Sequence, residues 1–282
     1  MTFRFDEATR VHANGDDTFS ARVHDGWDIG GNANGGYLLA LVSAAMCKAT
    51  GRSLPVAISC HYLGPVNDAD VVIETRVVKT GKAFATAHAT MRHGDRVVVT
   101  AIGTCGNALP PGARRHVTQE MANLPDFALA VPRGETGPNA NPNPNPNPNP
   151  NVNPNPIMPG LMQNVDVRLH PDDTGFARGA PNGQALVRGW CAFRDGRPVD
   201  ALALTLFCDS LPPAMFNVAG PPGWVPTVQL SFYLRGIPDG QPVAAEFLTR
   251  QLRDGMFEED GTMWNPSGEL VAQSRQLALL PR

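Results

Sequence analysis

The sequence contains no run of about 18 consecutive apolar residues, the length that a membrane-spanning helix requires. Its first residues mix charged and apolar side chains, whereas a signal peptide needs an uninterrupted apolar stretch, so we expect no leader. The five cysteines are widely spaced and form no Cys-x-x-Cys pair, which argues against the usual zinc and thioredoxin-like motifs. Such sparse cysteines fit a reducing compartment. We therefore predict a soluble, cytoplasmic protein without a membrane span.

An excess of positive charge is also lacking, since 23 lysines and arginines face 26 aspartates and glutamates. Without that excess the chain cannot neutralise many phosphates, and nucleic-acid binding is not expected. Three catalytic motifs are missing as well: the Gly-x-Ser-x-Gly turn of α/β-hydrolases, a glycine-rich phosphate loop and the His-Glu-x-x-His metal motif. We expect neither a metal nor an organic cofactor.

Residues 138–156 alternate asparagine and proline almost strictly. Each proline removes a backbone donor and biases the preceding asparagine away from helix. Because nothing in this tract can form a core, we interpret it as an extended or disordered spacer rather than a displayed recognition repeat. It belongs to a predicted linker, residues 108–160, between an N-terminal unit, residues 1–107, and a C-terminal unit, residues 161–282.

The two units share one order of elements. Residues 36–49 are apolar on all sides, which predicts a buried helix, and β-rich runs separated by turn residues follow it. In the second unit residues 199–211 carry the helical pattern and again precede β-rich runs. This repetition indicates an internal duplication of about 110 residues. The predicted strands are 55–63, 71–78, 84–92 and 96–104 in the first unit, and 227–234, 243–251, 256–264 and 269–280 in the second.

A long apolar helix followed by antiparallel strands, without β-α-β alternation, predicts an α+β fold in which a curved sheet covers the helix. A single such unit would leave an open sheet edge, and two copies remove it by joining their sheets edge to edge. Within this pattern four segments carry a more specific signal: residues 27–37, 208–214, 226–230 and 263–276.

These segments resemble the double-hotdog acyl-CoA thioesterases of the type II or TesB-like group, particularly the actinobacterial thioesterase-like proteins. The resemblance implies a double hotdog, in which two tandem units each wrap an antiparallel sheet around a central helix. It also implies acyl-CoA as the substrate, hydrolysis without a cofactor, and a role in fatty acid and lipid metabolism. Because a double hotdog is already an internal dimer, it can pair again as a homo-oligomer.

The resemblance also implies a polar trio that holds the attacking water: an acid, a Ser or Thr, and a Gln. Gln276 falls on the Gln position and Thr249 on the hydroxyl position, whereas Gln229 falls on the acid position. A glutamine orients water but cannot take its proton near neutral pH. Asp209, at the predicted end of the second helix, is therefore the leading substitute as the base, unless it only hydrogen-bonds nearby backbone.

The glycine-rich start of the first helix is the predicted site of the thioester carbonyl. Asn34, Gly35 and Gly36 would leave backbone N–H groups unpaired at the positive end of the helix dipole, where they polarise a carbonyl. The alternative is that these glycines only let the helix pack closely inside its sheet. Alternation along residues 227–234 puts Tyr233 on the face of Gln229, and we expect both to line the acyl-CoA channel.

Three functions are consistent with these patterns. The first is an acyl-CoA thioesterase that hydrolyses acyl-CoA to a free acid and CoA. The second, motivated by the glutamine at position 229, is a protein that binds acyl-CoA or an acyl carrier without hydrolysis. The third, a scaffold subunit that assembles through its sheets, needs no affinity for acyl-CoA.

Overall fold

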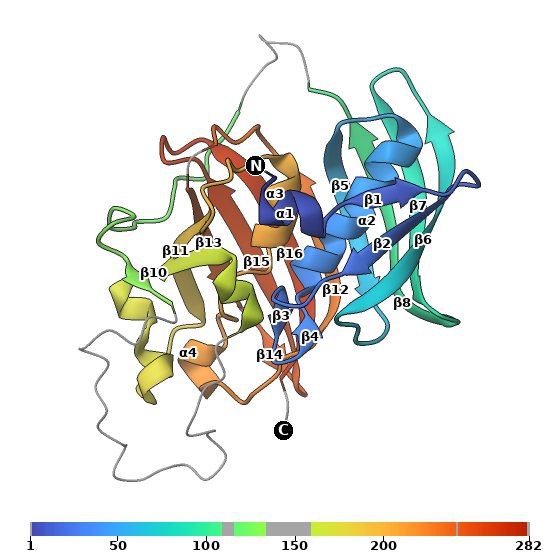
Figure 1. The fold of residues 1–282 in the computed structure, drawn as a ribbon. Coiled ribbons are helices and arrows are strands. Elements are labelled where there is room, and N and C mark those ends of the chain that lie inside the picture. The colour runs from blue at the N-terminus through green and yellow to red at the C-terminus, as the bar shows by residue number, and fades with distance from the viewer. Residues whose placement is uncertain (1, 109–115, 134–158, 241, 281–282) are drawn as a thin grey trace.

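The computed structural model describes residues 2–108, 116–133, 159–240 and 242–280, so the asparagine–proline tract at 138–156 lies outside the described residues (Figure 1). Its first half holds one long helix, α2, Gly35–Thr50, and a short one, α1, Arg4–Ala8. The strands of this half are β1, Val11–Ala13; β2, Thr18–Val23; β3, Asp28–Ile29; β4, Asn32–Ala33; β5, Leu54–Tyr62; β6, Ala69–Thr80; β7, Phe84–His93; and β8, Arg96–Gly106.

The second half contains two short helices, α3, Ala201–Phe207, and α4, Phe216–Ala219. Three 3-10 turns precede them: η1, Gly160–Gln163; η2, Pro171–Asp173; and η3, Gly175–Arg178. The strands of this half are β9, Val131–Pro132; β10, Val165–Leu169; β11, Leu186–Phe193; β12, Thr227–Leu234; β13, Val243–Leu248; β14, Leu252–Arg253; β15, Met256–Trp264; and β16, Leu270–Leu279. All eight predicted strands are therefore confirmed, with small shifts at their ends.

These strands form one antiparallel sheet that runs through both halves (Figure 1). The order is β1-β2-β6-β7-β8-β5-β12-β16-β15-β13-β11-β10-β9, with β14 paired to β15, while β3 and β4 form a separate pair. The halves meet where β5 pairs with β12, and Cys60 lies opposite Leu230 across this seam. The predicted α+β fold with sheets joined edge to edge is confirmed.

Helix α2 is buried on nearly all sides, as its apolar pattern predicted. Asn34 caps its start by accepting a 3.0 Å hydrogen bond from the backbone N–H of Tyr37. Gly51 ends it in the left-handed region, at a φ of 62°, where glycine has no steric penalty. Between these ends Leu39, Leu41 and similar residues have no exposed surface, so the helix forms the core of the first half.

Helix α3 is shorter than the predicted helix at 199–211. It begins after Asp200, whose carboxylate accepts a 2.8 Å hydrogen bond from the N–H of Ala203, and it ends at Phe207. A Cβ atom on Gly36 would collide with the carbonyl oxygen of Leu206 and lie 2.9 Å from that of Thr205. Glycine at position 36 therefore lets the start of α2 contact the end of α3 directly.

The segment 116–133 crosses the face of the second half of the sheet that is turned away from α3. Its Pro125 carbonyl accepts a 2.9 Å hydrogen bond from the Trp190 indole, and Gln119 donates one of 3.0 Å to Thr262. Phe127 packs edge-on against Trp190, with ring centroids 6.4 Å apart. We call this segment the strap, and it covers Trp190, Ala244 and Trp264, apolar residues that the strands would otherwise expose.

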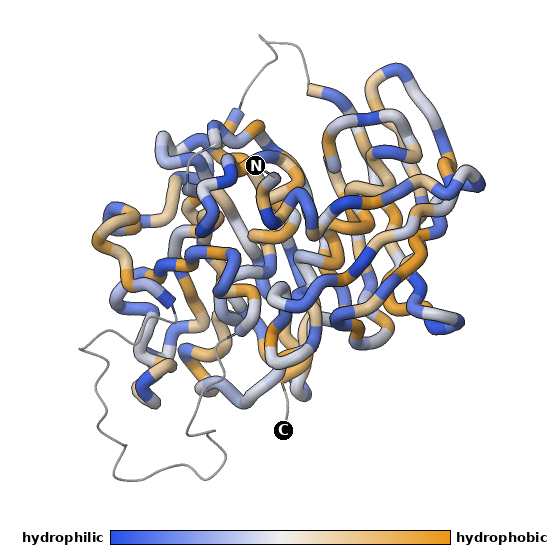
Figure 2. The backbone as a smooth tube through the Cα atoms, viewed as in Figure 1, coloured by the Kyte–Doolittle hydropathy of each residue, from blue (hydrophilic) through white to orange (hydrophobic). Residues whose placement is uncertain are grey.

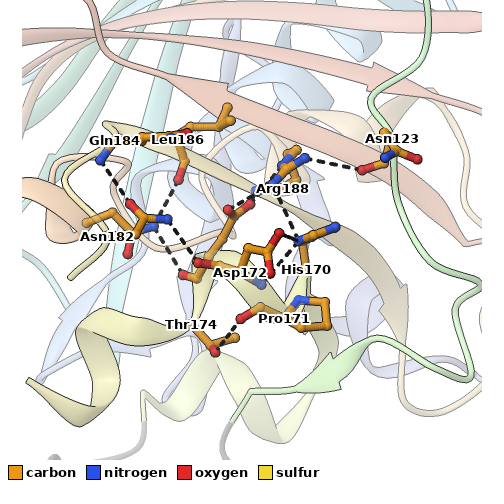
Figure 3. Close-up of polar contacts among 11 residues, drawn as sticks. Asn123, His170, Pro171, Asp172, Thr174, Asn182, Gln184, Leu186 and Arg188 are labelled. Carbon is orange, nitrogen blue, oxygen red and sulfur yellow. Dashed lines mark hydrogen bonds and ion pairs between the residues drawn. The ribbon is translucent and has the colours of Figure 1, made fainter. Parts of the chain in front are cut away.

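A second polar network secures the loops between β10 and β11 (Figure 3). The Arg188 guanidinium donates to both carboxylate oxygens of the buried Asp173, at 2.9 and 3.0 Å. Asn217 of α4 donates to the carbonyl oxygens of Asp173 and Leu186. These contacts join α4 to β11 and to the loop before it, so the network is structural, although the Asn217 Oδ1 atom has no hydrogen-bond partner among the described residues.

Short apolar and polar stretches alternate along the backbone, and hairpin tips at the margin of the first half are hydrophilic (Figure 2). No helix among the described residues is both long and apolar enough to cross a membrane.

Candidate active site

A partly buried carboxylate lies where the start of α2 meets the end of α3. Asp209 follows α3 by two residues, and its Oδ2 accepts a 3.1 Å hydrogen bond from the Gly36 N–H. The Asn34 side chain donates to the same oxygen at 2.9 Å and to the Asp209 carbonyl at 2.7 Å. The first N–H groups of a helix have no partner within it and carry partial positive charge. The negative charge of Asp209 is thus held at the N-terminus of α2.

Burial raises the pKa of Asp209 to about 6, because an ionised carboxylate loses its hydration in the interior. The hydrogen bonds from Gly36, Gly35 and Asn34 act in the opposite direction and keep the pKa from rising further. A carboxylate with a pKa near 6 is ionised at neutral pH and still basic enough to take a proton from water in a transition state.

The two glycines at the start of α2 make this arrangement sterically feasible. A Cβ atom on Gly35 would lie 3.0 Å from Asp209 Oδ2 and 3.1 Å from Tyr62 Cζ. The Tyr62 hydroxyl donates a 2.7 Å hydrogen bond to the Gly35 carbonyl, which fixes the ring against the helix start. The predicted helix start is therefore part of a polar site. Its Gly36 N–H holds Asp209, however, rather than standing unpaired as expected.

A second set of buried polar groups lies on the helix-facing side of the sheet. The Thr227 hydroxyl of β12 donates a 2.8 Å hydrogen bond to the Gln276 Oε1 atom of β16. Gln276 Nε2 donates in turn to Glu259 Oε1 of β15 at 2.7 Å. The Ala214 N–H ends this series of hydrogen bonds by donating to Glu259 Oε2 at 2.6 Å. Glu259 and Gln276 are 2% and 6% exposed, so water does not screen these contacts.

Asp209 lies close enough to the buried Glu259 for its charge to act on that group. Burial raises the pKa of Glu259 to about 7, and repulsion from Asp209 and Asp260 adds to this rise. The hydrogen bonds from Ala214 and Gln276 oppose it. Carboxyl groups with raised pKa values that gather in one place are a physical signature of acid–base sites. Asp209, Glu259, Gln276 and Thr227 therefore form one polar cluster, which we call the acid cluster.

Gln229 does not belong to the acid cluster, and here the predicted trio is corrected. A β-bulge between Thr227 and Gln229 interrupts the alternation of β12, so that Thr227 pairs with Ala278 and Gln229 pairs with Leu277. Thr227 consequently faces the helices together with Gln276, whereas Gln229 faces away. The Gln229 amide donates instead to Ser59 at 2.9 Å and to Ser231 at 2.7 Å.

Tyr233 shares the outer face with Gln229 and is 39% exposed, with the Arg235 guanidinium 5.2 Å from its ring centroid. The structure does not bring it to the acid cluster, which corrects the expected channel wall. The alternation inferred from the sequence was correct beyond the bulge, but the face that carries the cluster is the other one.

Thr249 lies one residue beyond β13, whose last pair joins Leu248 to Asp260. The next position along this ladder faces Glu259, so Thr249 lies at the margin of the acid cluster. Its hydroxyl is buried and has no hydrogen-bond partner among the described residues. The Thr249 hydroxyl makes no hydrogen bond to Gln276, and Thr227 makes the one that was expected of it.

Two residues of the cluster were not anticipated from the sequence. Thr227 follows a proline at the start of a strand, and only the bulge turns it inward. Glu259 belongs to the acidic run Glu258-Glu259-Asp260, which is typical of a solvated turn or edge. The alternation of Phe257, Glu259 and Gly261 along β15 was the available signal, since it places an acid among inward-facing residues.

A surface hollow of about 650 Å³ lies elsewhere, over β1, β2 and β6. None of the residues that line it belongs to the acid cluster, and two of its three arginines, Arg22 and Arg92, are paired with acidic neighbours. Within the described ranges no three His, Cys, Asp or Glu side chains gather closely enough to hold a metal ion.

Comparison with known proteins gives consistent matches to both halves. Residues 23–106 match the family model described as acyl-CoA thioesterase N-terminal domain, and residues 136–280 match the one described as acyl-CoA thioesterase C-terminal domain. An uncharacterized protein of Mycobacterium tuberculosis is 28% identical, over 93% of this chain and 91% of its own length.

Solved structures agree with these sequence matches. A candidate thioesterase II from Thermobifida fusca superimposes with a TM-score of 0.84 and 29% identity, over 100% of this chain and 98% of that one. A hotdog-fold protein of unknown function from Alicyclobacillus acidocaldarius gives a TM-score of 0.81 at 23% identity, over 100% and 99% of the two chains. The predicted double hotdog is thereby confirmed.

Proposed function

Since this chain belongs to the acyl-CoA thioesterase family, we propose that it hydrolyses acyl-CoA thioesters to a free carboxylic acid and CoA. The observation that carries the proposal is the position of Asp209, a partly buried carboxylate fixed at the N-terminus of α2. Its charge acts on Glu259, which is linked through Gln276 to the Thr227 hydroxyl. This combination supplies the base and the orienting groups that water needs to attack a thioester.

In the proposed reaction Asp209 accepts a proton from water while the water oxygen bonds to the thioester carbonyl carbon. The carbonyl electrons move to oxygen and give a tetrahedral oxyanion. When the carbonyl re-forms, the carbon–sulfur bond breaks, and the proton held by Asp209 passes to the CoA sulfur. The carboxylic acid and CoA thiol account for all atoms of the thioester and the water.

Thr227 and Gln276 have the proposed role of orienting the water. Because the Thr227 hydroxyl donates its hydrogen to Gln276, its oxygen is left to accept a hydrogen bond from the water. The water oxygen then turns its lone pair toward the substrate carbon. Alignment of this kind reduces the entropic cost of reaching the transition state.

The start of α2 has the proposed role of stabilising the oxyanion. Its Gly36 N–H points to the Asp209 carboxylate while that group is ionised. Once Asp209 has taken the proton from water it is neutral and a weaker acceptor. The N–H groups and the helix dipole are then available to the negative charge that has moved to the substrate oxygen.

Binding without hydrolysis is the alternative function. It was motivated by a glutamine at the expected acid position, yet Gln229 points away from the acid cluster and Asp209 supplies a carboxylate inside it. The geometry therefore favours the hydrolase. We place the reaction in fatty acid and other lipid metabolism in the cytoplasm, where acyl-CoA is the thioester to be hydrolysed.

The test is thiol release from short, medium and long acyl-CoAs by the wild-type protein and by Asp209→Asn. The asparagine keeps an oxygen that accepts from Gly36 but cannot take a proton. We expect saturable release by the wild type and a loss of about 100-fold or more in kcat for the variant. Acyl-CoA binding without release by the wild type would establish the non-hydrolytic alternative.

A further inference from the structure

Glu259 makes two hydrogen bonds, and it accepts in both of them while its carboxylate is ionised. Its Oε2 accepts from the Ala214 N–H at 2.6 Å, and a backbone N–H can only donate. Its Oε1 accepts from Gln276 Nε2 at 2.7 Å, and an ionised carboxylate can only accept. The side chain is 2% exposed, so no bulk water competes for either oxygen.

Within the active site proposed above, on which this inference rests, we infer that Glu259 is a positioning residue that sets the direction of the hydrogen bond between Thr227 and Gln276. Facing an ionised carboxylate, the Gln276 amide must turn its NH2 group to Glu259. Its carbonyl oxygen then faces Thr227, whose hydroxyl must donate to it at 2.8 Å. The Thr227 oxygen is thereby committed to accepting a hydrogen from the water.

Protonation of Glu259 reverses this order. The proton must sit on Oε1, because Oε2 faces a group that can only donate. An Oε1–H group requires an acceptor, so the Gln276 amide turns its oxygen to Glu259 and its NH2 group to Thr227. Thr227 then accepts from Gln276 and directs its own hydrogen at the water. A lone pair of the water oxygen then accepts the hydrogen bond from Thr227 and no longer points at the substrate carbon.

The groups that act on this equilibrium come from several elements. Asp209 after α3 and Asp260 on β15 both raise the pKa of Glu259, together with burial, while the contacts from Ala214 and Gln276 lower it. Asp260 is itself paired with Arg250 and Arg275, and the Thr249 hydroxyl faces the cluster from the β13 side without a charge. Because the resulting pKa is about 7, the switch operates near neutral pH.

Glu259→Gln tests the inference with little change in shape. The Ala214 N–H demands the oxygen of the new amide, so the NH2 group of this side chain must face Gln276. That geometry imitates the protonated acid at every pH. We expect kcat to fall about 10- to 100-fold with little change in KM, because a misdirected water costs rate rather than binding.

The pH profile separates a positioning role from a structural one. In the wild type kcat should rise with pH through two ionisations, near 6 for Asp209 and near 7 for Glu259. In Glu259→Gln the upper ionisation should vanish while the lower one persists. The matched control is Glu258→Gln, which removes a neighbouring carboxylate that accepts from the backbone N–H groups of Arg250 and Gln251. It should keep the wild-type profile.

Exchanging the carboxylate and the amide between positions 259 and 276 should restore the kcat lost in Glu259→Gln. In the double variant Glu259→Gln with Gln276→Glu, the carboxylate at position 276 accepts from both the amide at position 259 and the Thr227 hydroxyl, so Thr227 again donates. We expect this variant to recover most of the kcat lost in the single variant. A swap as slow as the single variant, or a single variant with wild-type kcat and pH profile, overturns the inference while leaving the hydrolase intact. A wild type that releases no thiol overturns both.

Discussion

The Thr227 hydroxyl lies 2.8 Å from the Gln276 side-chain oxygen, although an uninterrupted strand would place Thr227 on the opposite face of the sheet. The bulge between Thr227 and Gln229 adds one residue to β12. As a result, the side chain of Thr227 points to the opposite face from the one that regular alternation would give it. Without this bulge the site proposed here would lose its hydroxyl. A backbone irregularity of a single residue thus decides which side chains meet in the acid cluster.

Thr227→Val should lower kcat about 10- to 100-fold, since it removes the hydroxyl proposed to orient the water at nearly constant volume. The matched control is Thr249→Val, which removes the unpartnered buried hydroxyl. That control should keep kcat within a few-fold and stabilise the fold by about 1 kcal/mol, because an unsatisfied buried polar group is costly. Kinetics and urea unfolding measure both effects. A larger loss of kcat in Thr249→Val would return the water site to Thr249.

Gln276→Ala and Gln229→Ala should differ in their kinetic effect. Gln276 links Thr227 to Glu259 inside the cluster, whereas Gln229 contacts two serines on the outer face. We expect Gln276→Ala to lose about 100-fold in kcat and Gln229→Ala to stay within a few-fold of the wild type. Thiol release at saturating acyl-CoA measures the difference, with circular dichroism as the check on folding. Equal losses would contradict the assignment of the two faces.

The stability of the fold should fall as pH rises from about 4 to 7, because Asp209 and Glu259 ionise in this range. Asp209 and Glu259 have raised pKa values, about 6 and about 7. Between the unfolded and folded pKa the unfolded chain has lost a proton that the folded chain keeps, so raising the pH favours unfolding. Each group should contribute a loss of about 3 kcal/mol by pH 8, because each pKa lies more than two units above its ordinary value and one pKa unit corresponds to about 1.4 kcal/mol.

Urea unfolding at pH 5 and pH 8 tests this, with wild type and Asp209→Asn compared at each pH. The difference between them isolates Asp209 from carboxylates such as Asp260, whose pKa is lowered by Arg275 and whose effect has the opposite sign. We expect the asparagine variant to gain stability relative to wild type on going to pH 8. An unchanged difference between the two pH values would show that Asp209 is not desolvated.

Gly36→Ala should destabilise the protein by about 2 to 4 kcal/mol, although alanine favours a helix by about 1 kcal/mol over glycine. The added Cβ would push against the Leu206 and Thr205 carbonyls at the contact of α2 with α3. The control is Gly35→Ala, whose Cβ meets the Asp209 carboxylate and the Tyr62 ring instead. Gly35→Ala should lower kcat by displacing the Asp209 carboxylate, while its free energy of unfolding should change less than that of Gly36→Ala. Thermal unfolding and kcat measured on both variants check the contrast.

Much of the fold could be predicted because it depends on local patterns. Helix α2 and the paired strands of both halves follow from apolar periodicity and turn residues, and the duplication follows from their order. The strands β10 and β11 and the strap were not predicted, since their pairing depends on contacts with distant segments. The end of the second helix was placed too late, because the apolar run continues past Phe207 into the core.

The site was predicted only in part. Asp209 and Gln276 could be identified, and Asn34 and Gly36 lie beside Asp209 as the helix start suggested. Gln229 was assigned to the cleft face and Thr227 was not considered for the site, because a bulge leaves no clear mark in residue type. Glu259 was missed because a charged residue is usually exposed, and only three-dimensional packing shows it buried.

The proposed activity requires the two halves of the chain to be joined where β5 pairs with β12. Asn34 and Gly36 come from one half of the chain and Asp209 and Gln276 from the other, so neither half contains all residues of the proposed site. Separately produced half-chains would be inert, and mixing them would restore turnover only to the extent that the seam re-forms. The rate of thiol release would therefore be proportional to the concentration of correctly joined molecules, as the signal of a split reporter is.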